Sequence, residues 1–284
     1  MTDQKLRPWI NWPLLRPRVP VVPVIRLSGV IGGMPLRGTG LTLNSVNPAL
    51  ERAFKVRGAK AVALVINSPG GSAVQSDLIA QRIRGLAGEA KIPVLAFIED
   101  VGASGGYWLA LAGDELFAEA NSIVGSIGVL HASFGFAEAI GRLGIERRLH
   151  TAGSKKAMLD PFRPQDPDDV ARLHGILDDI HTSFKQAVRE RRGDRLKGPD
   201  EELFEGQIWT GRAAVDTGLV DRIGNMHEVL RQRYGSKVRL PHVSMVRPWW
   251  QRRLGVGRSI DSQAFVHGLL DSLAERALWA RYGL

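Results

Sequence analysis

Ser104 is the residue best placed to act as a nucleophile, in the segment Gly102-Ala103-Ser104-Gly105-Gly106. An apolar run that predicts a strand precedes this segment, and a pattern typical of a helix follows it. A serine at such a turn is presented at the carboxyl edge of a sheet with backbone N–H groups beside it, as in a nucleophile elbow. A glycine-rich turn with an incidental serine is the alternative reading.

A second loop, Asn67-Ser68-Pro69-Gly70-Gly71-Ser72, also follows a buried apolar run. Its glycines permit unusual backbone angles and close approach, so their N–H groups are free to bind an oxyanion, a phosphate or a peptide carbonyl. Taken alone, the loop is better interpreted as an ordinary strand-to-helix turn.

A third segment, Ala152-Gly153-Ser154-Lys155-Lys156, offers a base for the serine. A lysine that is desolvated enough to be neutral near pH 7 accepts a proton from a hydroxyl without any metal. Two solvated surface charges are the plainer interpretation of Lys155 and Lys156.

The elements around these loops alternate between strands and helices. Apolar, β-branched runs predict strands at Val21–Leu27, Ala61–Ile66, Pro93–Ile98, Glu115–Ala118 and Ile123–Val129. Helical spacing or capping residues predict helices at Asn47–Lys55, Ser76–Ala87, Tyr107–Ala112, Asp168–Arg192, Ala213–Thr217, Met226–Tyr234 and Ser259–Arg281, with a polar loop or short helix at Gly193–Gly206. This order predicts an α/β fold with a mainly parallel sheet.

The composition excludes several classes of protein. The 284 residues contain no Cys, which excludes a disulfide scaffold, a cysteine-ligated metal centre and a thiol nucleophile. No run of about 18 apolar residues predicts a membrane span, and prolines and arginines interrupt the N-terminus where a signal peptide would be apolar. We therefore expect a cytoplasmic chain that needs no cofactor or metal.

The net charge of +9 belongs to the two ends of the chain. Residues 1–26 carry +4 and residues 237–284 carry +5, whereas residues 27–236 are neutral. Five of the seven tryptophans also lie in these ends: Trp9, Trp12, Trp249, Trp250 and Trp279. Such ends suit packing against a neighbouring subunit or peripheral contact with an anionic membrane; no recognition motif for nucleic acid accompanies them.

Together the three loops resemble the signal peptide peptidase A family of serine peptidases, family S49, which has a crotonase/Clp-protease-like fold. The matching stretches are Ile66–Ser72, Ala103–Tyr107 and Gly125-Ser126-Ile127-Gly128-Val129, with weaker support from Thr151–Lys156, Ile208–Arg212 and Gly218–Asp221. Their order matches the family from about Val21 to about Leu230. Many members carry an N-terminal membrane anchor that this sequence lacks, and Val124 stands where Thr is common.

The resemblance implies a Ser–Lys dyad with Ser104 as nucleophile and Lys156, 52 residues later, as general base; Lys155 is the less favoured choice. Gly70 or Gly71, with Gly105, would supply the oxyanion hole, and Ser126 would orient the lysine or serve only as a turn hydroxyl. An extended peptide would add a strand beside two segments, which include Ser72, Ala73, Ile127 and Gly128.

The implied enzyme is an endopeptidase that cuts signal-peptide remnants or other protein fragments. The fold would be a crotonase/Clp-like α/β domain of repeated β-β-α units over residues 21–236. Residues 1–20 form a basic extension rich in Trp and Pro, and residues 237–284 form a basic, helical one. Peptidases of this fold group assemble into rings in which the serine and the lysine can come from one subunit or from two neighbouring ones, so we expect a homo-oligomer whose dissociated monomer is inactive.

Three other readings remain open. A crotonase-type acyl-CoA enzyme would share the fold, but its acidic residues would have to be Glu99 and Asp100. An α/β-hydrolase esterase needs an Asp and a His after Ser104, and none of the seven His stands in a motif. A catalytically retired scaffold that binds peptides would not need both Ser104 and Lys156.

Overall fold

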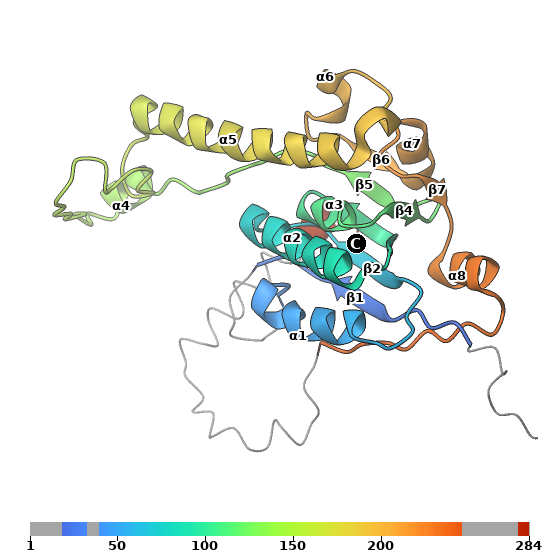
Figure 1. Cartoon of the computed structure of the whole chain (residues 1–284). Coiled ribbons are helices and arrows are strands. Elements are labelled where there is room, and N and C mark those ends of the chain that lie inside the picture. Colours follow the sequence, from blue (N-terminus) through green and yellow to red (C-terminus); the bar gives the residue numbers. More distant parts are fainter. Residues whose placement is uncertain (1–18, 33–39, 246–277, 284) are drawn as a thin grey trace, which may run out of the picture.

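The computed structural model describes residues 19–32, 40–245 and 278–283, within which seven strands form one sheet (Figure 1). The order across the sheet is β1-β2-β3-β4-β7, and β5 pairs with both β3 and β6. Every pairing is parallel except that of β5 with β6. The strands are β1 (Val24–Ser28), β2 (Val62–Ser68), β3 (Val94–Ala103), β4 (Glu115–Ala118), β5 (Ile123–Gly125), β6 (Ile208–Thr210) and β7 (Arg222–Ile223). The predicted α/β class with a mainly parallel sheet is confirmed.

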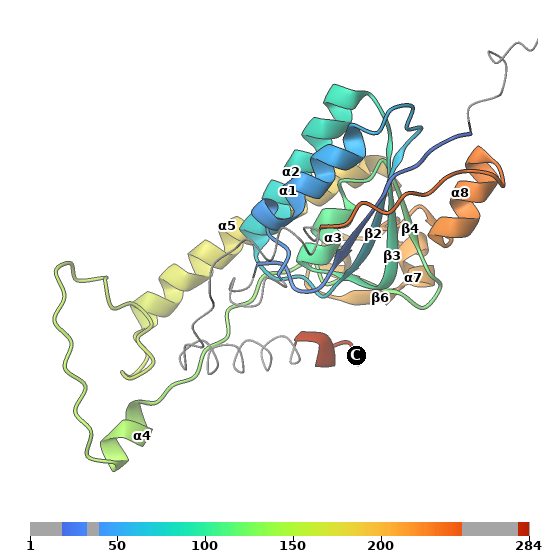
Figure 2. The same ribbon diagram turned by 90° about the horizontal axis from the view of Figure 1, so that it is seen from below.

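Helices cover one face of the sheet and bury its larger core (Figures 1 and 2). They are α1 (Leu43–Phe54), α2 (Ala73–Ala90), α3 (Gly105–Ala110) and the second half of α5 (Pro167–Arg192). On the opposite face, Leu230 of α8 (Met226–Tyr234) packs in a smaller cluster with Phe97 and Phe117, whose rings stack 4.9 Å apart. Because both faces are covered, β2 up to Ile66 and the first half of β3 consist of continuous apolar residues.

Helices α1 and α2 begin a turn earlier than the sequence pattern predicts, and α3 and α7 (Gly211–Asp216) begin slightly earlier. The helix expected from Asn47 starts at Leu43, because Thr42 and Ser45 form a capping box, and Pro48 lies inside it on an exposed turn. The helix expected from Ser76 starts at Ala73, where the Ser72 hydroxyl accepts a hydrogen bond from the Gln75 N–H at 3.3 Å. The long helix expected at Asp168–Arg192 is confirmed almost to the residue as α5.

Strand β3 is longer than expected and contains an irregularity. The apolar run ends at Ile98, yet the strand continues through Glu99 and Asp100 to Ala103. Its pairing with β2 shifts between Ile66/Ile98 and Ser68/Gly102, so β3 carries extra residues at this point. Residue Ser104 follows directly.

An arm of residues 130–166 leaves the body beyond β5 and returns at the start of α5 (Figures 1 and 2). It contains the short helix α4 (Ala137–Arg142) and is held by its own contacts, such as the Phe136 and Phe162 rings 5.6 Å apart. No hydrogen bond or ion pair links residues 137–160 to the sheet among the described residues. The first half of α5 likewise has no buried residue; its buried side chains are Phe184, Val188 and Arg192.

The remaining short elements close the body beside β4 and β5: η2 (Gly193–Arg195), α6 (Asp200–Leu203) and α7 (Gly211–Asp216). Beyond α8 the chain runs along β1, where the Val22 N–H bonds Arg239 O and the Val24 N–H bonds Pro241 O, each at 2.9 Å. The helix expected at Ser259–Arg281 lies mostly outside the described residues, of which residues 278–280 are helical. The predicted boundary at residue 236 stays a prediction.

Candidate active site

Ser104 lies at the sharp turn between β3 and α3, at the carboxyl edge of the sheet. Its φ of 51° and ψ of −124° fall in a region that residues with a side chain rarely adopt. The turn is fixed from both sides, since the Ser104 N–H donates to Gly125 O at 2.7 Å and its carbonyl accepts from the Trp108 N–H at 3.1 Å. The half-buried hydroxyl has no hydrogen-bond partner within the described ranges. This is the geometry of a nucleophile elbow.

The loop after β2 lies against this turn. Gly70 and Gly71 have φ values of 102° and 141°, which favour glycine. A Cβ atom on Gly70 would be 2.9 Å from the Gly105 nitrogen, so a side chain would not fit. The loop is tied to Ile31, whose N–H donates to Gly70 O and whose carbonyl accepts from the Ser72 N–H, both at 2.8 Å.

The two loop glycines differ in what their N–H groups do. The Gly70 N–H donates to the buried Ser68 hydroxyl at 3.2 Å. The N–H groups of Gly71 and Gly105 have no partner among the described residues, and a Cβ atom on Gly105 would be 3.4 Å from the Gly71 nitrogen. Two unpaired donors therefore lie close together beside Ser104. Sequence reasoning treated Gly70 and Gly71 alike; the buried, polar Ser68 at the end of an apolar strand was the signal that one of them is engaged.

The expected substrate-binding segments are only partly open. On one side, the Ser72 N–H is bonded to Ile31 O and Ala73 begins α2, which leaves Gly71 as the exposed residue of that segment. On the other side, the N–H of Ser126 donates to Gln207 O at 2.6 Å. Ile127 is buried, and its carbonyl accepts from the Gly206 N–H at 3.1 Å and lies 3.3 Å from Nε2 of His181.

These contacts continue the β5–β6 pairing. They occupy one edge of the segment from Ser126 to Gly128. Ser126 has a φ of 52°, follows directly on the carbonyl that binds the Ser104 N–H, and is half-buried.

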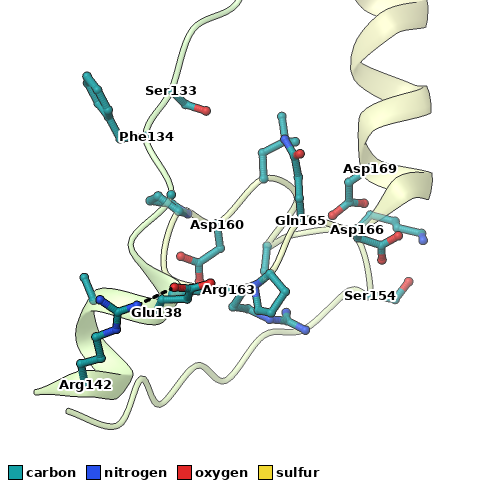
Figure 3. Close-up of a pocket in the computed structure, with 18 residues that line it drawn as sticks. Ser133, Phe134, Glu138, Arg142, Ser154, Asp160, Arg163, Gln165, Asp166 and Asp169 are labelled. Atoms are coloured by element: carbon teal, nitrogen blue, oxygen red, sulfur yellow. Dashed lines mark hydrogen bonds and ion pairs between the residues drawn. The ribbon is translucent and has the colours of Figure 1, made fainter. Parts of the chain in front are cut away.

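Both candidate lysines lie on the arm, away from Ser104. Lys155 and Lys156 are exposed in a series of turns, where the Lys156 N–H donates to Gly153 O at 3.2 Å. In both views the arm extends away from α3, so a single chain does not bring the lysine loop to Ser104 (Figures 1 and 2). Lys155 and Ser154 line an open pocket of about 760 Å³ between the arm and the start of α5, which Glu138, Arg142 and Asp166 also line (Figure 3).

Helix α3, which begins at the serine, is anchored at its other side by buried groups. The Tyr107 hydroxyl donates to Leu219 O at 2.7 Å, and burial raises the pKa of Tyr107 well above its ordinary value. Trp108 stacks on Phe184 of α5 with ring centroids 4.5 Å apart. The elbow is therefore mounted on a rigid part of the body.

A buried ion pair holds α5 to the loop that Tyr107 contacts. Arg192, which is 2% exposed, donates to both carboxylate oxygens of Asp221 at 2.9 and 3.0 Å and to Gly218 O. Burial raises the pKa of Asp221, but the hydrogen bonds from Arg192 and from the Leu116 N–H outweigh it and hold that pKa below its ordinary value.

No group of His, Asp and Glu in the described ranges has the arrangement of a metal site. None of the helices described is both long and apolar enough to cross a membrane.

The fold and the elbow define an α/β protein with a serine nucleophile geometry, and comparisons with known proteins name its family. The model of peptidase family S49 matches residues 87–237, more than half of the chain, and the chain belongs to this family. This confirms the resemblance seen in the sequence.

Relatives carry protease names in several organisms. A putative protease of Methanocaldococcus jannaschii is 33% identical over 183 residues, covering 64% of this chain and 57% of that protein. The chloroplastic serine protease SPPA of Arabidopsis thaliana is 30% identical over 217 residues, covering 74% of this chain and 31% of that protein.

A third relative has a different name. A protein of Brucella abortus named Na(+)/H(+) antiporter NhaA is 49% identical over 273 residues, which is 93% of this chain. This chain spans only 37% of that protein's length.

Proposed function

We propose that the chain is a serine endopeptidase in which Ser104 is the nucleophile. The observation that carries the proposal is Ser104 at a strained elbow, beside two unpaired N–H groups from Gly71 and Gly105, in a member of peptidase family S49. Two such donors stabilise the oxyanion of a tetrahedral intermediate, and the loss of one typically costs about 10²–10³ in rate.

Lys156 acts as the base in this proposal. Its neutral amine takes the hydroxyl proton as Oγ of Ser104 attacks the substrate carbonyl carbon, and the oxyanion forms between Gly71 and Gly105. The C–N bond then breaks, and the lysine returns the proton to the leaving amine. Water, deprotonated by the same amine, attacks the acyl-enzyme and releases the second product, and the proton passes back to Ser104.

The lysine comes from a neighbouring copy of the chain. In support, the arm carries the lysine loop away from the body and exposes large apolar side chains, among them Phe134 at 79%, Leu143 at 74% and Ile145 at 56%. Exposed apolar clusters of this kind mark interaction sites. In a closed ring, the arm of each chain lies on the body of the next chain. Each chain then supplies the lysine to one active site and the serine to another.

The substrate is an extended peptide segment from a signal-peptide remnant or another protein fragment. Main-chain pairing with Gly71 and with the free edge of the segment after Ser126 would hold it as an added strand. The exposure of Gly71 and the hydrogen bonds of that segment to Gly206 and Gln207 on one edge support this mode.

A mixing experiment tests the dyad and its sharing between chains. S104A and K156A should each abolish peptide hydrolysis, whereas K155A, the neighbouring lysine on the same loop, should retain it. If the dyad is shared, S104A and K156A chains assembled together should recover about a quarter of the wild-type activity. Hydrolysis by S104A alone would refute the serine mechanism, and a mixed assembly with no activity would refute the sharing.

We further propose that this cytoplasmic peptidase touches an anionic membrane through its basic, tryptophan-bearing ends. Support comes from the charge distribution and from the Brucella relative, in which the matching segment is part of a chain named as an antiporter. Residues 1–18, 246–277 and 284 of these ends lie outside the described residues. Deletion of residues 1–18 and 251–284 should abolish co-sedimentation with phosphatidylglycerol liposomes, and unchanged binding would refute this placement.

A further inference from the structure

The irregularity in β3 decides which residue faces the glycine loop. Ile66 pairs with Ile98, but Ser68 pairs with Gly102, so two steps along β2 correspond to four along β3. Without the two extra residues, Gly70 would be level with Gly102; with them it is level with Ser104. The direct packing of Gly70 against Ser104 agrees with this shifted register.

Strand β3 also changes its other neighbour at the same place. It pairs with β4 up to Ile98 and with β5 from Val101 onward. The residues between, Glu99 and Asp100, thus separate a first half of β3 that builds the core from a second half that leads to Ser104. The position of the nucleophile depends on how this short break is held.

Asn67 of β2 holds the break from one side. Its Oδ1 accepts a hydrogen bond from the Val101 N–H at 3.2 Å, and its Nδ2 donates to Oδ2 of Asp100 at 2.5 Å. On the other side, the buried Ser122 hydroxyl contacts the carbonyls of Ile98 and Glu99. The Glu99 side chain is not part of this arrangement, because it forms an ion pair with Arg26 on β1.

We infer that Asn67 is a positioning residue, which acts through Asp100 and Val101 to set Ser104 level with the oxyanion loop. The inference rests on the proposed serine peptidase function and extends it to a residue outside the dyad and the oxyanion hole. In this inference Asp100 has a structural role that involves no proton transfer. A crotonase-type acyl-CoA enzyme would instead need the residue for acid–base catalysis. A displacement of about 1 Å at a nucleophile costs up to about 10² in rate.

The test is a reversal of the Asn67–Asp100 hydrogen bond in the full-length assembly. N67D places two carboxylates against each other and should lower the rate at which a fluorophosphonate labels Ser104 by roughly 10- to 100-fold, and kcat with it, while KM changes little. N67D/D100N restores the pair with donor and acceptor exchanged, and should recover the labelling rate to within about fivefold of wild type. E99Q, in the same break, is the matched control and should label at the wild-type rate.

Each outcome bears on the inference. Labelling rates are compared per folded, assembled chain, with melting temperature and light scattering measured for every variant, so that a loss of folding is not counted as a loss of positioning. Wild-type labelling by folded N67D, or a double variant no faster than N67D, would overturn the inference. Failure of the proposed function is separate: it shows as peptide hydrolysis or labelling that survives in S104A.

Discussion

Gly70 and Ser104, on two different strand ends, pack so closely that a Cβ atom on Gly70 would be 2.8 Å from the Cβ atom of Ser104. Real Cβ atoms do not approach other atoms so closely, and the other neighbours of that position are backbone atoms of Ala103 and Gly105. The glycine loop and the serine elbow therefore form one packed unit.

Gly70→Ala should inactivate the enzyme. The methyl group would force the loop and the elbow apart, and Gly70 also has a φ of 102°, which alanine tolerates poorly. We expect peptide hydrolysis and fluorophosphonate labelling to fall by at least about 10². Gly85→Ala is the control, because no atom lies within 4 Å of a Cβ at this position in α2; equal activity of the two variants would contradict the close packing.

Ser104→Gly should fold more stably than Ser104→Ala, although both are inactive. The positive φ strains any residue with a Cβ atom at position 104. Glycine relieves a strain of about 1–3 kcal/mol but loses about 0.5–1 kcal/mol to the entropy of the unfolded chain. Urea unfolding should place S104G about 1 kcal/mol above S104A, and a lower stability would show that the elbow is unstrained.

Asp221→Asn should be among the most destabilising changes in the body. It leaves the buried Arg192 without its carboxylate, which typically costs about 3–5 kcal/mol. Because the pKa of Asp221 is held below its ordinary value, its contribution is complete above about pH 4 and is lost as the pH falls through the lowered pKa.

The melting temperatures of D221N and wild type should therefore differ widely at pH 7 and converge in acid. Glu138→Gln is the control, since Glu138 forms an ion pair with Arg142 in which both side chains are more than four-fifths exposed. A gap for D221N that is constant down to pH 2 would show that the charge of Asp221 is unimportant.

The substitutions Phe134→Asp and Leu143→Asp should each dissociate the proposed homo-oligomer and stop peptide hydrolysis without unfolding the chain. Both side chains are more than 70% exposed on the arm, so a charge there costs little within one chain but much at an interface. Light scattering should show smaller particles with an unchanged circular dichroism spectrum. Val19→Asp, at a 42% exposed apolar residue outside the arm, should remain assembled; full assembly of the arm variants would exclude this surface as the contact.

The sequence predicted those strands and helices that depend on residues close to one another in the chain. Ala61–Ile66 and Pro93–Ile98 form buried strands because their apolar runs suit a sheet covered on both faces, and α5 ends where its capping residues indicate. The glycine loops after these strands were found by the same reasoning and do meet at Ser104.

The parts that sequence reasoning missed depend on contacts between distant residues. Nothing near Glu99 and Asp100 shows that Asn67, more than 30 residues earlier, holds them inside a strand. The strand β6 exists because it pairs with β5, and the arm was not foreseen because its apolar residues have no core beneath them. The glycine whose N–H group remains unpaired could likewise be identified only from the position of Ser68, whose hydroxyl accepts the hydrogen bond of the Gly70 N–H.

The arm has a consequence for control of the proposed activity. If Ser104 is the nucleophile and Lys156, on the arm that points away from it, is the base, a newly made chain would carry both groups and yet be inert. Its specific activity should then rise steeply with total protein concentration and vanish on dilution. Dilution would protect surrounding proteins during synthesis, without a propeptide or an inhibitor.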